Sequence, residues 1–485
     1  MRRASSVLFS SCVSLVLACG DSSGGGGEAT TLPGTESATD SQSSDSQVSD
    51  SQTGASDSTP TMGDGDGDES GPPTAEGDGD GDTTTNPSMG DGDGEGDGDG
   101  DSSSSDSGPK FDNMIPDEPG DPGCQGNGEN GELDFSYIWI ANSPQGTVSK
   151  IDTQTMVEEA RYQARPQGGG MPSRTSVNLN GDVVVASREG GVTKIFASPE
   201  DCVDSNGTPG LQTSTGKNDV LAWGEEECIA WYADYSFMSE RAVAWTSGSF
   251  NQGTCEWEGA KVWVGATNDA VNLEVLRLDG QTGAEEDAIS IPGTAGFMSR
   301  APYGAAVDLD NNLWMVNGYC GASLVFVDND DLSYEIIAPP QQVCAYGLAV
   351  DSQGYVWVGG YQTYTGRYDP ETQQWDLIQA QGLGIQEDAE GRMWLGAYGQ
   401  NGVYEIDADT LEVLSYTALP TTGQSKGVAV DFFGYIWVVS DGGTTALRMD
   451  PDTYEFETYA GLDSPYSYSD MTGWGLKNTA GAPQG

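Results

Sequence analysis

The residues best suited to bind a ligand are tyrosines and basic side chains that stand at corresponding turns of a repeated unit. Aromatic rings beside a few cations are typical of a pocket for a polar organic ligand, such as a glycan or a peptide. The alternative is that these side chains only fill and hydrogen-bond the mouth of a central channel. The predicted ligand-binding residues are Arg174, Arg188, Arg300, Tyr303, Tyr346, Tyr361, Lys426 and Trp474, and the same turns also carry Arg241, Tyr319, Tyr364, Tyr398 and Asp441.

Residues for catalysis are much harder to find. The chain has no histidine, which excludes Ser/His/Asp and Cys/His nucleophiles. No glycine-rich phosphate loop follows a strand and opens a helix. A carboxylic acid such as Glu189 or Asp441 could act as a general acid or base, but no spacing marks a pair. We therefore assign no catalytic residue.

Two acidic stretches invite comparison with a calcium-binding loop. Residues 91–102 begin with alternating carboxylates, but Ser102 stands where an EF-hand needs a bidentate glutamate. Residues 202–213 begin with Cys202 and end with Thr213, neither of which is an EF-hand ligand there. We assign no metal ligand, and calcium or magnesium remains an alternative only.

The elements that must position the candidate residues belong to a repeat that is clearest in residues 344–382. This unit contains four short strands bounded by turn residues. A period of roughly 40 to 45 residues with four strands per unit predicts a β-propeller. The second strands of the seven repeats are expected at Tyr137–Asn142, Val183–Ser187, Val262–Ala266, Leu313–Asn317, Tyr355–Gly360, Met393–Ala397 and Ile436–Ser440.

The first repeat lacks its first strand, which the end of the chain can supply. Residues 471–477 (MTGWGLK) match the entries of later repeats, so they are predicted to complete the first blade and close the ring. The fold class is therefore all-β, a seven-bladed β-propeller over residues 136–480. An insertion at about 198–240 is a candidate recognition element, because long loops on a rigid scaffold often carry function.

Other recurring residues have structural explanations. A tryptophan in six of the seven second strands is expected to pack between neighbouring blades. Basic residues on third strands are expected to form ion pairs with a neighbouring blade. These basic residues are Lys150, Lys194, Arg277, Arg367 and Arg448.

Cysteine usage indicates an oxidising compartment. Cys320 and Cys344 should meet at the ligand-binding end of the propeller and form a disulfide. Cys202 and Cys228 are expected to form a disulfide within the insertion. The partners of Cys124 and Cys255 stay open.

The N-terminal region has the features of a membrane-anchored tether. Residues 1–18 have the pattern of a signal peptide, and the sequence before Cys19 resembles the lipobox of bacterial lipoproteins, which implies that Cys19 is lipidated. An ordinary secretory signal is the alternative. Residues 19–110 contain no aromatic residue and are predicted to be a disordered acidic tether, and residues 111–135 form a Pro/Gly-rich neck. The expected location is the bacterial cell envelope, at the outer membrane.

Charge limits the partners. The net charge is −57, and 54 of the 76 acidic residues lie after residue 110, so the folded part is acidic as well. Such a surface repels nucleic acid and anionic headgroups. We therefore expect a monomer that meets the membrane only through its lipid anchor and binds an unknown ligand or an envelope protein.

The blade pattern resembles the streptogramin lyase (virginiamycin B lyase) group of seven-bladed propellers and the related NHL-type repeats. The resemblance rests on PYGAAVDLDNNLWMVN, AYGLAVDSQGYVWVGGY and SKGVAVDFFGYIWVVS, each followed at a distance by a turn such as RYDPET, and it covers residues 136–477. It implies the scaffold. The lyase depends on a histidine with a magnesium ion nearby, and no residue here can take the role of that histidine.

Two functions follow as hypotheses. The first is a surface-tethered, non-catalytic binding module for a polar organic ligand, a glycan or a protein partner. The second is a lyase or hydrolase that uses carboxylates and a divalent cation in the central channel. A purely structural envelope protein is a third interpretation.

Overall fold

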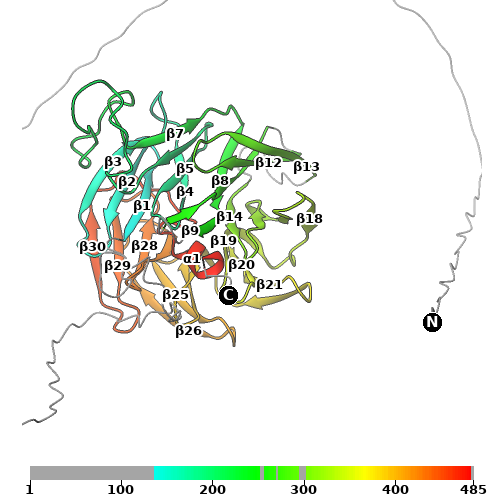
Figure 1. Ribbon diagram of the computed structural model, residues 1–485. Coiled ribbons are helices and arrows are strands. Elements are labelled where there is room, and N and C mark those ends of the chain that lie inside the picture. Colours follow the sequence, from blue (N-terminus) through cyan, green and yellow to red (C-terminus); the bar gives the residue numbers. More distant parts are fainter. Residues whose placement is uncertain (1–135, 252–255, 269–270, 294–301, 482–485) are drawn as a thin grey trace, which may run out of the picture. The chain divides into compact units, whose positions relative to one another are not determined.

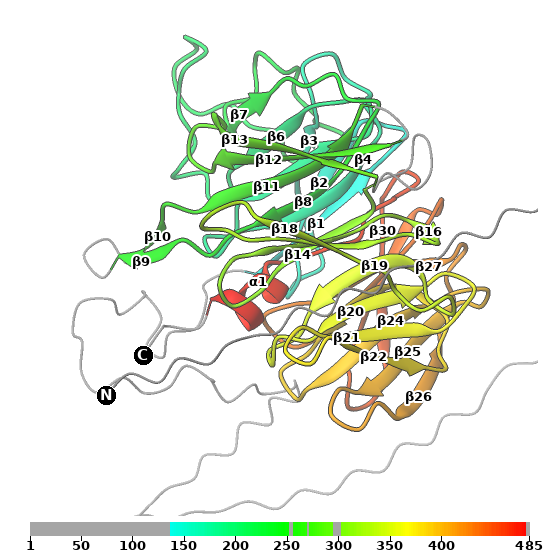
Figure 2. The ribbon, with the colours of Figure 1, turned by 90° about the vertical axis from the view of Figure 1, so that its right-hand side faces the viewer.

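The computed structural model describes residues 136–251, 256–268, 271–293 and 302–481. The predictions for the signal peptide, Cys19, the tether, the neck, Cys124, Cys255 and Arg300 lie outside these residues. Seven antiparallel sheets stand side by side around a short helix, α1 (Trp474–Ala480), as Figures 1 and 2 show. The predicted seven-bladed β-propeller is confirmed. No helix in the described part of the chain is long and apolar enough to cross a membrane.

The first three blades each run from an inner to an outer strand. Blade 1 lacks a regular inner strand, and blade 3 carries an additional hairpin, β9–β10, between its first two strands. Blade 1 holds β1 (Tyr137–Asn142), β2 (Thr147–Asp152) and β3 (Glu158–Gln163); blade 2 holds β4 (Pro172–Val177), β5 (Val183–Ser187), β6 (Val192–Ile195) and β7 (Ile229–Ala233); blade 3 holds β8 (Ser239–Trp245), β9 (Ser249–Asn251), β10 (Glu256–Glu258), β11 (Lys261–Thr267), β12 (Asn272–Asp279) and β13 (Glu285–Pro292).

The last four blades are regular four-stranded sheets, and a short strand, β16, adds to the inner edge of blade 5. Blade 4 holds β14 (Gly304–Val307), β15 (Leu313–Val316), β17 (Leu324–Val327) and β18 (Tyr334–Ile337); blade 5 holds β16 (Tyr319–Cys320), β19 (Cys344–Val350), β20 (Val356–Gly360), β21 (Thr365–Asp369) and β22 (Gln374–Ile378); blade 6 holds β23 (Gly382–Glu387), β24 (Arg392–Ala397), β25 (Gly402–Asp407) and β26 (Val413–Ala418); blade 7 holds β27 (Ser425–Val430), β28 (Ile436–Ser440), β29 (Thr445–Met449) and β30 (Phe456–Ala460).

The predicted second strands lie where the sequence placed them. They are almost wholly buried because both faces meet neighbouring blades: β20 is buried at all five residues. Outer strands are exposed, as in β26, where no residue is buried. Continuous apolar runs in the sequence therefore indicate inner strands, whereas the outer strands alternate between more and less exposed residues.

The chain end closes the ring, but with a different segment from the predicted one. The backbone N–H of Tyr466 donates to the Ala141 carbonyl at 3.0 Å, and the N–H of Trp139 donates to the Met471 carbonyl at 2.9 Å. Residues 465–471 thus lie along β1, whereas residues 474–477 belong to α1. The reason is local: the Asp470 carboxylate accepts from the N–H groups of Gly473 and Leu476, each at 2.8 Å, and so turns the chain into a helix.

Helix α1 covers one end of the ring axis. Its side chains hydrogen-bond to the carboxyl ends of first strands: Trp474 Nε1 donates to the Glu387 carbonyl at 2.9 Å, and Thr479 Oγ1 donates to the Val350 carbonyl at 3.0 Å. A cavity of about 40 Å³ remains between the helix and the first strands. The ends where first strands begin lie on the opposite side, so the two ends of the ring have different chemistry.

The insertion differs in extent from the prediction of 198–240. Residues 229–233 form β7, the outer strand of blade 2, and β8 begins at Ser239. The insertion therefore comprises residues 196–228. It joins a third strand to a fourth strand, so it starts and finishes at the end of the ring that α1 covers. The predicted disulfide between Cys202 and Cys228 is present and packs with Trp139 and Tyr162 of blade 1.

An aspartate–tryptophan hydrogen bond recurs in four blades. In each, the aspartate that follows the first strand accepts the indole N–H of the second-strand tryptophan and also two backbone N–H groups of its own turn. Asp431, for example, accepts from Trp437 Nε1 at 2.8 Å and from the N–H groups of Phe433 and Tyr435. The equivalent indole bonds join Asp308 to Trp314, Asp351 to Trp357 and Asp388 to Trp394.

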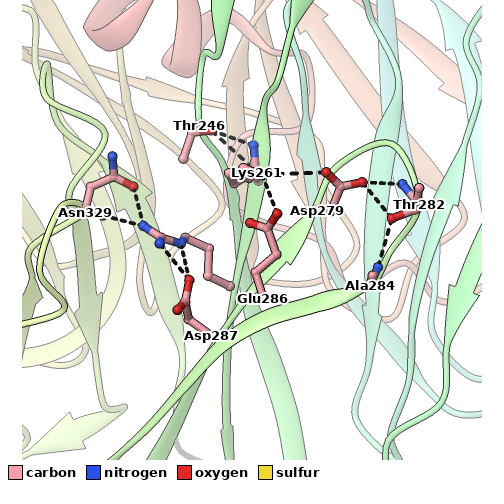
Figure 3. A network of polar contacts seen from close by, with 9 residues as sticks. Thr246, Lys261, Asp279, Thr282, Ala284, Glu286, Asp287 and Asn329 are labelled. Atoms are coloured by element: carbon pink, nitrogen blue, oxygen red, sulfur yellow. Dashed lines mark hydrogen bonds and ion pairs between the residues drawn. The ribbon is translucent and has the colours of Figure 1, made fainter.

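The third-strand basic residues do not form the ion pairs between blades that the sequence suggested. Arg367 pairs with Asp376 on the next strand of its own blade at 2.8 Å, and its guanidinium donates to the Ala408 carbonyl of the following blade at 2.8 Å. Arg277 behaves alike, because it joins Asp287 of its own blade to Asn329 of the next (Figure 3). The link between blades is a hydrogen bond to a turn carbonyl or amide.

We predict that Asp431→Ala lowers the free energy of unfolding by about 2–4 kcal/mol, because three donors lose their acceptor in a fully buried site. Urea unfolding followed by tryptophan fluorescence measures the change. The matched control is Asp450→Ala, whose carboxylate accepts only turn N–H groups near the surface and should cost under ~1 kcal/mol. Equal effects of the two changes would contradict the role given to the indole bond.

Candidate functional site

Six tyrosines gather where the first strands begin, at the end of the ring opposite α1. We call this group the tyrosine mouth. Three of its rings are buried and pack with Leu383, and three are half-buried. Neighbouring rings lie 4.7 to 6.3 Å apart between centroids, which is the usual range for interacting aromatic pairs. The buried members are Tyr303, Tyr346 and Tyr468, and the half-buried members are Tyr361, Tyr398 and Tyr466.

A fully buried arginine lies beneath the tyrosine mouth. Arg174, on β4, donates from Nε to the Tyr303 carbonyl at 2.7 Å and from Nη1 to the Ser173 carbonyl at 3.1 Å. Its guanidinium lies over the ring of Tyr468, while its Nη2 has no hydrogen-bond partner among the described residues. Burial lowers the pKa of Arg174 to about 9. A buried cation without a carboxylate is costly, so the site holds positive charge at some expense of stability.

Three further cations touch the same rings. The guanidinium of Arg188 lies 4.4 Å from the centroid of Tyr466, the ammonium of Lys426 lies 4.1 Å from that centroid, and the guanidinium of Arg241 lies 5.0 Å from the centroid of Tyr303. Lys426 also pairs with Asp441 at 2.5 Å. Burial is the main cause that lowers the pKa of Arg188, and the positive charge of Arg241 lowers it further. The arginines thus repel one another across a small space.

These cations change the acidity of Tyr466. Its hydroxyl lies 2.9 Å from the hydroxyl of Tyr346. Burial by itself disfavours the phenolate, but the charges of Lys426 and Arg174 together with the hydrogen bond from Tyr346 outweigh it and lower the pKa of Tyr466 to about 8. Burial and the neighbouring tyrosines raise the pKa of Tyr346, which therefore stays a hydrogen-bond donor.

The structure brings together six of the eight predicted ligand-binding residues: Arg174, Arg188, Tyr303, Tyr346, Tyr361 and Lys426. Arg300 lies outside the described residues. The placement of Trp474 on this face was wrong, because Trp474 belongs to α1 at the other end of the ring. The physical reason is the turn at Asp470, which moves residues after 471 out of the closing strand.

Two members of the tyrosine mouth, Tyr466 and Tyr468, were missed. They belong to residues 465–471, the segment that closes blade 1. Their spacing of two residues, in SPYSYSD, is the available signal, because alternate residues of an extended segment point the same way. The predicted closing strand began at Met471, so these tyrosines fell outside it.

The predicted disulfide between Cys320 and Cys344 is present at the same end of the ring. Cys320 belongs to β16, which pairs with β19 just before Tyr346. The bond ties a second-to-third-strand loop of blade 4 to the inner strand of blade 5. It therefore fixes the backbone on one side of the tyrosine mouth.

A polar pocket of about 440 Å³ adjoins the tyrosine mouth on blade 5. Its lining contains no charged residue. Gln362 joins the two regions, because its Nε2 donates to the Tyr398 hydroxyl at 2.7 Å. The lining residues are Gln342, Gln362, Thr363, Tyr364, Gln379 and Gln381.

Within the described ranges, no group of three or more cysteine or acidic side chains is arranged to hold a metal ion. The stretch at residues 202–213, compared above with a calcium loop, is organised by a protein carboxylate instead. Glu227 accepts from the N–H groups of Ser205, Asn206 and Gln212 at 2.6, 2.8 and 2.8 Å. Its two oxygens thus satisfy backbone donors of the insertion.

Fold and site together define a seven-bladed β-propeller with a cationic, tyrosine-lined mouth at one end of its axis. No protein-family model and no curated relative matches the chain. Among solved structures, the chain is similar to virginiamycin B lyase from Staphylococcus aureus, at 14% identity over 62% of this chain and 89% of that one, with a TM-score of 0.44. It is also similar to AztD from Citrobacter koseri, at 11% identity over 69% of this chain and 97% of that one, with a TM-score of 0.45. A third similar structure is the dihydro-heme d1 dehydrogenase NirN, at 13% identity over 71% of this chain and 77% of that one, with a TM-score of 0.45. At this level the similarity concerns the fold alone.

We predict that one tyrosine of the native protein ionises near pH 8, well below the ordinary tyrosine pKa of 10.0. Near-ultraviolet absorbance of the phenolate measures it, and Tyr466→Phe should remove that step. Lys426→Gln should move the step to higher pH, because a stabilising charge is lost. An unchanged titration curve in Tyr466→Phe would contradict the assignment.

Proposed function

We propose that this chain is a surface-tethered, non-catalytic binding protein whose propeller takes a polar organic ligand at the tyrosine mouth. The observation that carries the proposal is the convergence of Arg174, Arg188, Arg241 and Lys426 on the rings of Tyr303, Tyr466 and Tyr468.

The charge of the whole chain makes this convergence informative. Only 19 residues are basic against 76 acidic ones. Scattered basic residues would each find a carboxylate nearby, as Arg367 and Arg277 do on third strands. At the tyrosine mouth, by contrast, Arg174 and Arg188 form no ion pair with a described carboxylate, and each keeps a buried nitrogen without a partner among the described residues. Buried donors without acceptors are uncommon and favour a ligand that supplies the acceptor.

The test of the site is a thermal-shift screen of the purified full chain against glycans, peptides and small polar metabolites. We expect Tyr361→Ala to weaken binding of any hit at least about tenfold, because this half-buried ring is accessible to a ligand. Tyr334→Ala, on the exposed outer strand β18, is the matched control and should bind normally. Undiminished binding in Tyr361→Ala would exclude the tyrosine mouth as the site.

We further propose that the propeller is held at the bacterial cell envelope, at the outer membrane, through a lipid on Cys19. The sequence VLAC before a long acidic segment supports this proposal. The segment 20–110 carries 22 of the acidic residues and no aromatic side chain, so it suits a spacer between a membrane and a folded domain.

Cells that express the full chain with a labelled fatty acid should incorporate the label, and the protein should fractionate with membranes. Cys19→Ser should abolish labelling and release the protein. Cys12→Ser, within the signal region, is the control and should retain the label. Membrane association that persists without label in Cys19→Ser would overturn the anchor.

A further inference from the structure

We infer that the ligand is an acidic oligosaccharide, with its carboxylate at Arg188 beside the Lys426–Asp441 ion pair, and with its neutral sugar rings over Tyr361 and Tyr398 and in the adjoining glutamine-lined pocket. This inference rests on the proposed function and names the ligand class of the same site. Its basis is a series of side-chain contacts that leads from the cations at the ring axis to the uncharged, amide-rich pocket on blade 5.

The cationic end is suited to one anionic group. Arg188 Nε and Arg174 Nη2 are buried without partners among the described residues, and Arg188 is itself half-buried, so a ligand can reach it while the deeper Arg174 adds charge from below. The other side of the Arg188 guanidinium is held in place, because its Nη2 donates to the Ser143 hydroxyl at 2.8 Å. Because a guanidinium presents paired donors, it matches the two oxygens of a carboxylate.

An unbroken series of contacts leads outward from this cationic end. Tyr466 contacts Tyr346 through their hydroxyls, and the ring of Tyr346 lies 6.0 Å from that of Tyr361. Tyr361 meets Tyr398 edge-on at 4.7 Å, and the Tyr398 hydroxyl accepts from Gln362. Beyond it, Gln379 Nε2 donates to the Tyr364 hydroxyl at 3.3 Å. The cationic end and the glutamine-lined pocket therefore adjoin through Tyr361, Tyr398 and Gln362.

The neutral end is suited to sugar hydroxyls. Each glutamine amide offers both donors and an acceptor, so it can pair with hydroxyls that also donate and accept. Tyrosine rings beside these amides give flat apolar faces for sugar C–H groups. The volume of about 440 Å³ falls in the usual range for a small-ligand site. Gln362 has a φ of 62°, a conformation that a glutamine rarely adopts and that is common at binding loops.

A peptide fits these observations less well. The pocket is lined by glutamines, one threonine and one tyrosine, and it offers no aliphatic wall for apolar peptide side chains. The edge of the nearest inner strand, β19, is already paired with β16, so an added peptide strand would find its hydrogen bonds taken. A saccharide needs neither feature.

The test is calorimetry of the full chain with a neutral oligosaccharide that carries one uronic acid at its end, and with the same oligosaccharide after reduction of that carboxylate to an alcohol. We expect the acidic form to bind at least about tenfold more tightly, and added salt to weaken it. Arg188→Gln should remove most of that preference, because it weakens the acidic form much more than the reduced form. Lys217→Gln, an exposed change of equal charge on the insertion, should alter neither.

Gln379→Ala should weaken both saccharides alike, because it acts at the neutral end. Equal binding of the acidic and reduced saccharides, or an unchanged preference in Arg188→Gln with native stability, would overturn the inference. Binding only of carboxylate-bearing peptides, still sensitive to Tyr361→Ala, would also overturn it while the proposed function stands. Hits whose affinity is insensitive to Tyr361→Ala would remove the proposed function itself.

Discussion

The hydrogen bonds between β1 and residues 465–471 are the constraint on which the rest of this molecule depends. They join the first blade to the last segment of the chain, so seven sheets become a closed ring. The same segment carries Tyr466 and Tyr468 into the tyrosine mouth and then, through the turn at Asp470, leads into the helix that covers the opposite end. One stretch of seven residues, 465–471, therefore closes the ring, adds two tyrosines to the tyrosine mouth and leads into helix α1.

The blades on either side of the closure are held by contacts of the same kind. Arg448 on β29 donates to the Thr153 carbonyl of blade 1, just as Arg367 on β21 donates to the Ala408 carbonyl of blade 6. The buried second strands make the apolar contacts between neighbouring blades, and the guanidiniums of Arg367 and Arg448 hydrogen-bond each blade to the next. Because each blade contacts its neighbours on both sides, the backbone that carries the tyrosine mouth is held in place by the closed ring.

Charge is distributed unevenly between the rim and the axis. Third-strand arginines such as Arg277 and Arg367 pair with carboxylates of their own blades, whereas Arg174, Arg188 and Arg241 lie close enough to repel one another at the axis. Three arginines of a strongly acidic protein thus lie together beside tyrosine rings at the axis, where burial strengthens electrostatic interactions. Tyr466 responds to that positive charge through its lowered pKa.

The number of blades, the position of every second strand, both described disulfides and most of the tyrosine mouth were predictable from the amino-acid sequence. Repetition made this possible, because each blade restates the same turns and apolar runs. Four features became visible only in the folded chain: which residues close the ring, where Trp474 lies, how far the insertion extends, and that third-strand arginines reach carbonyls of the next blade. Those features depend on single hydrogen bonds, at Asp470 above all, and on contacts between segments hundreds of residues apart, for which no local pattern exists.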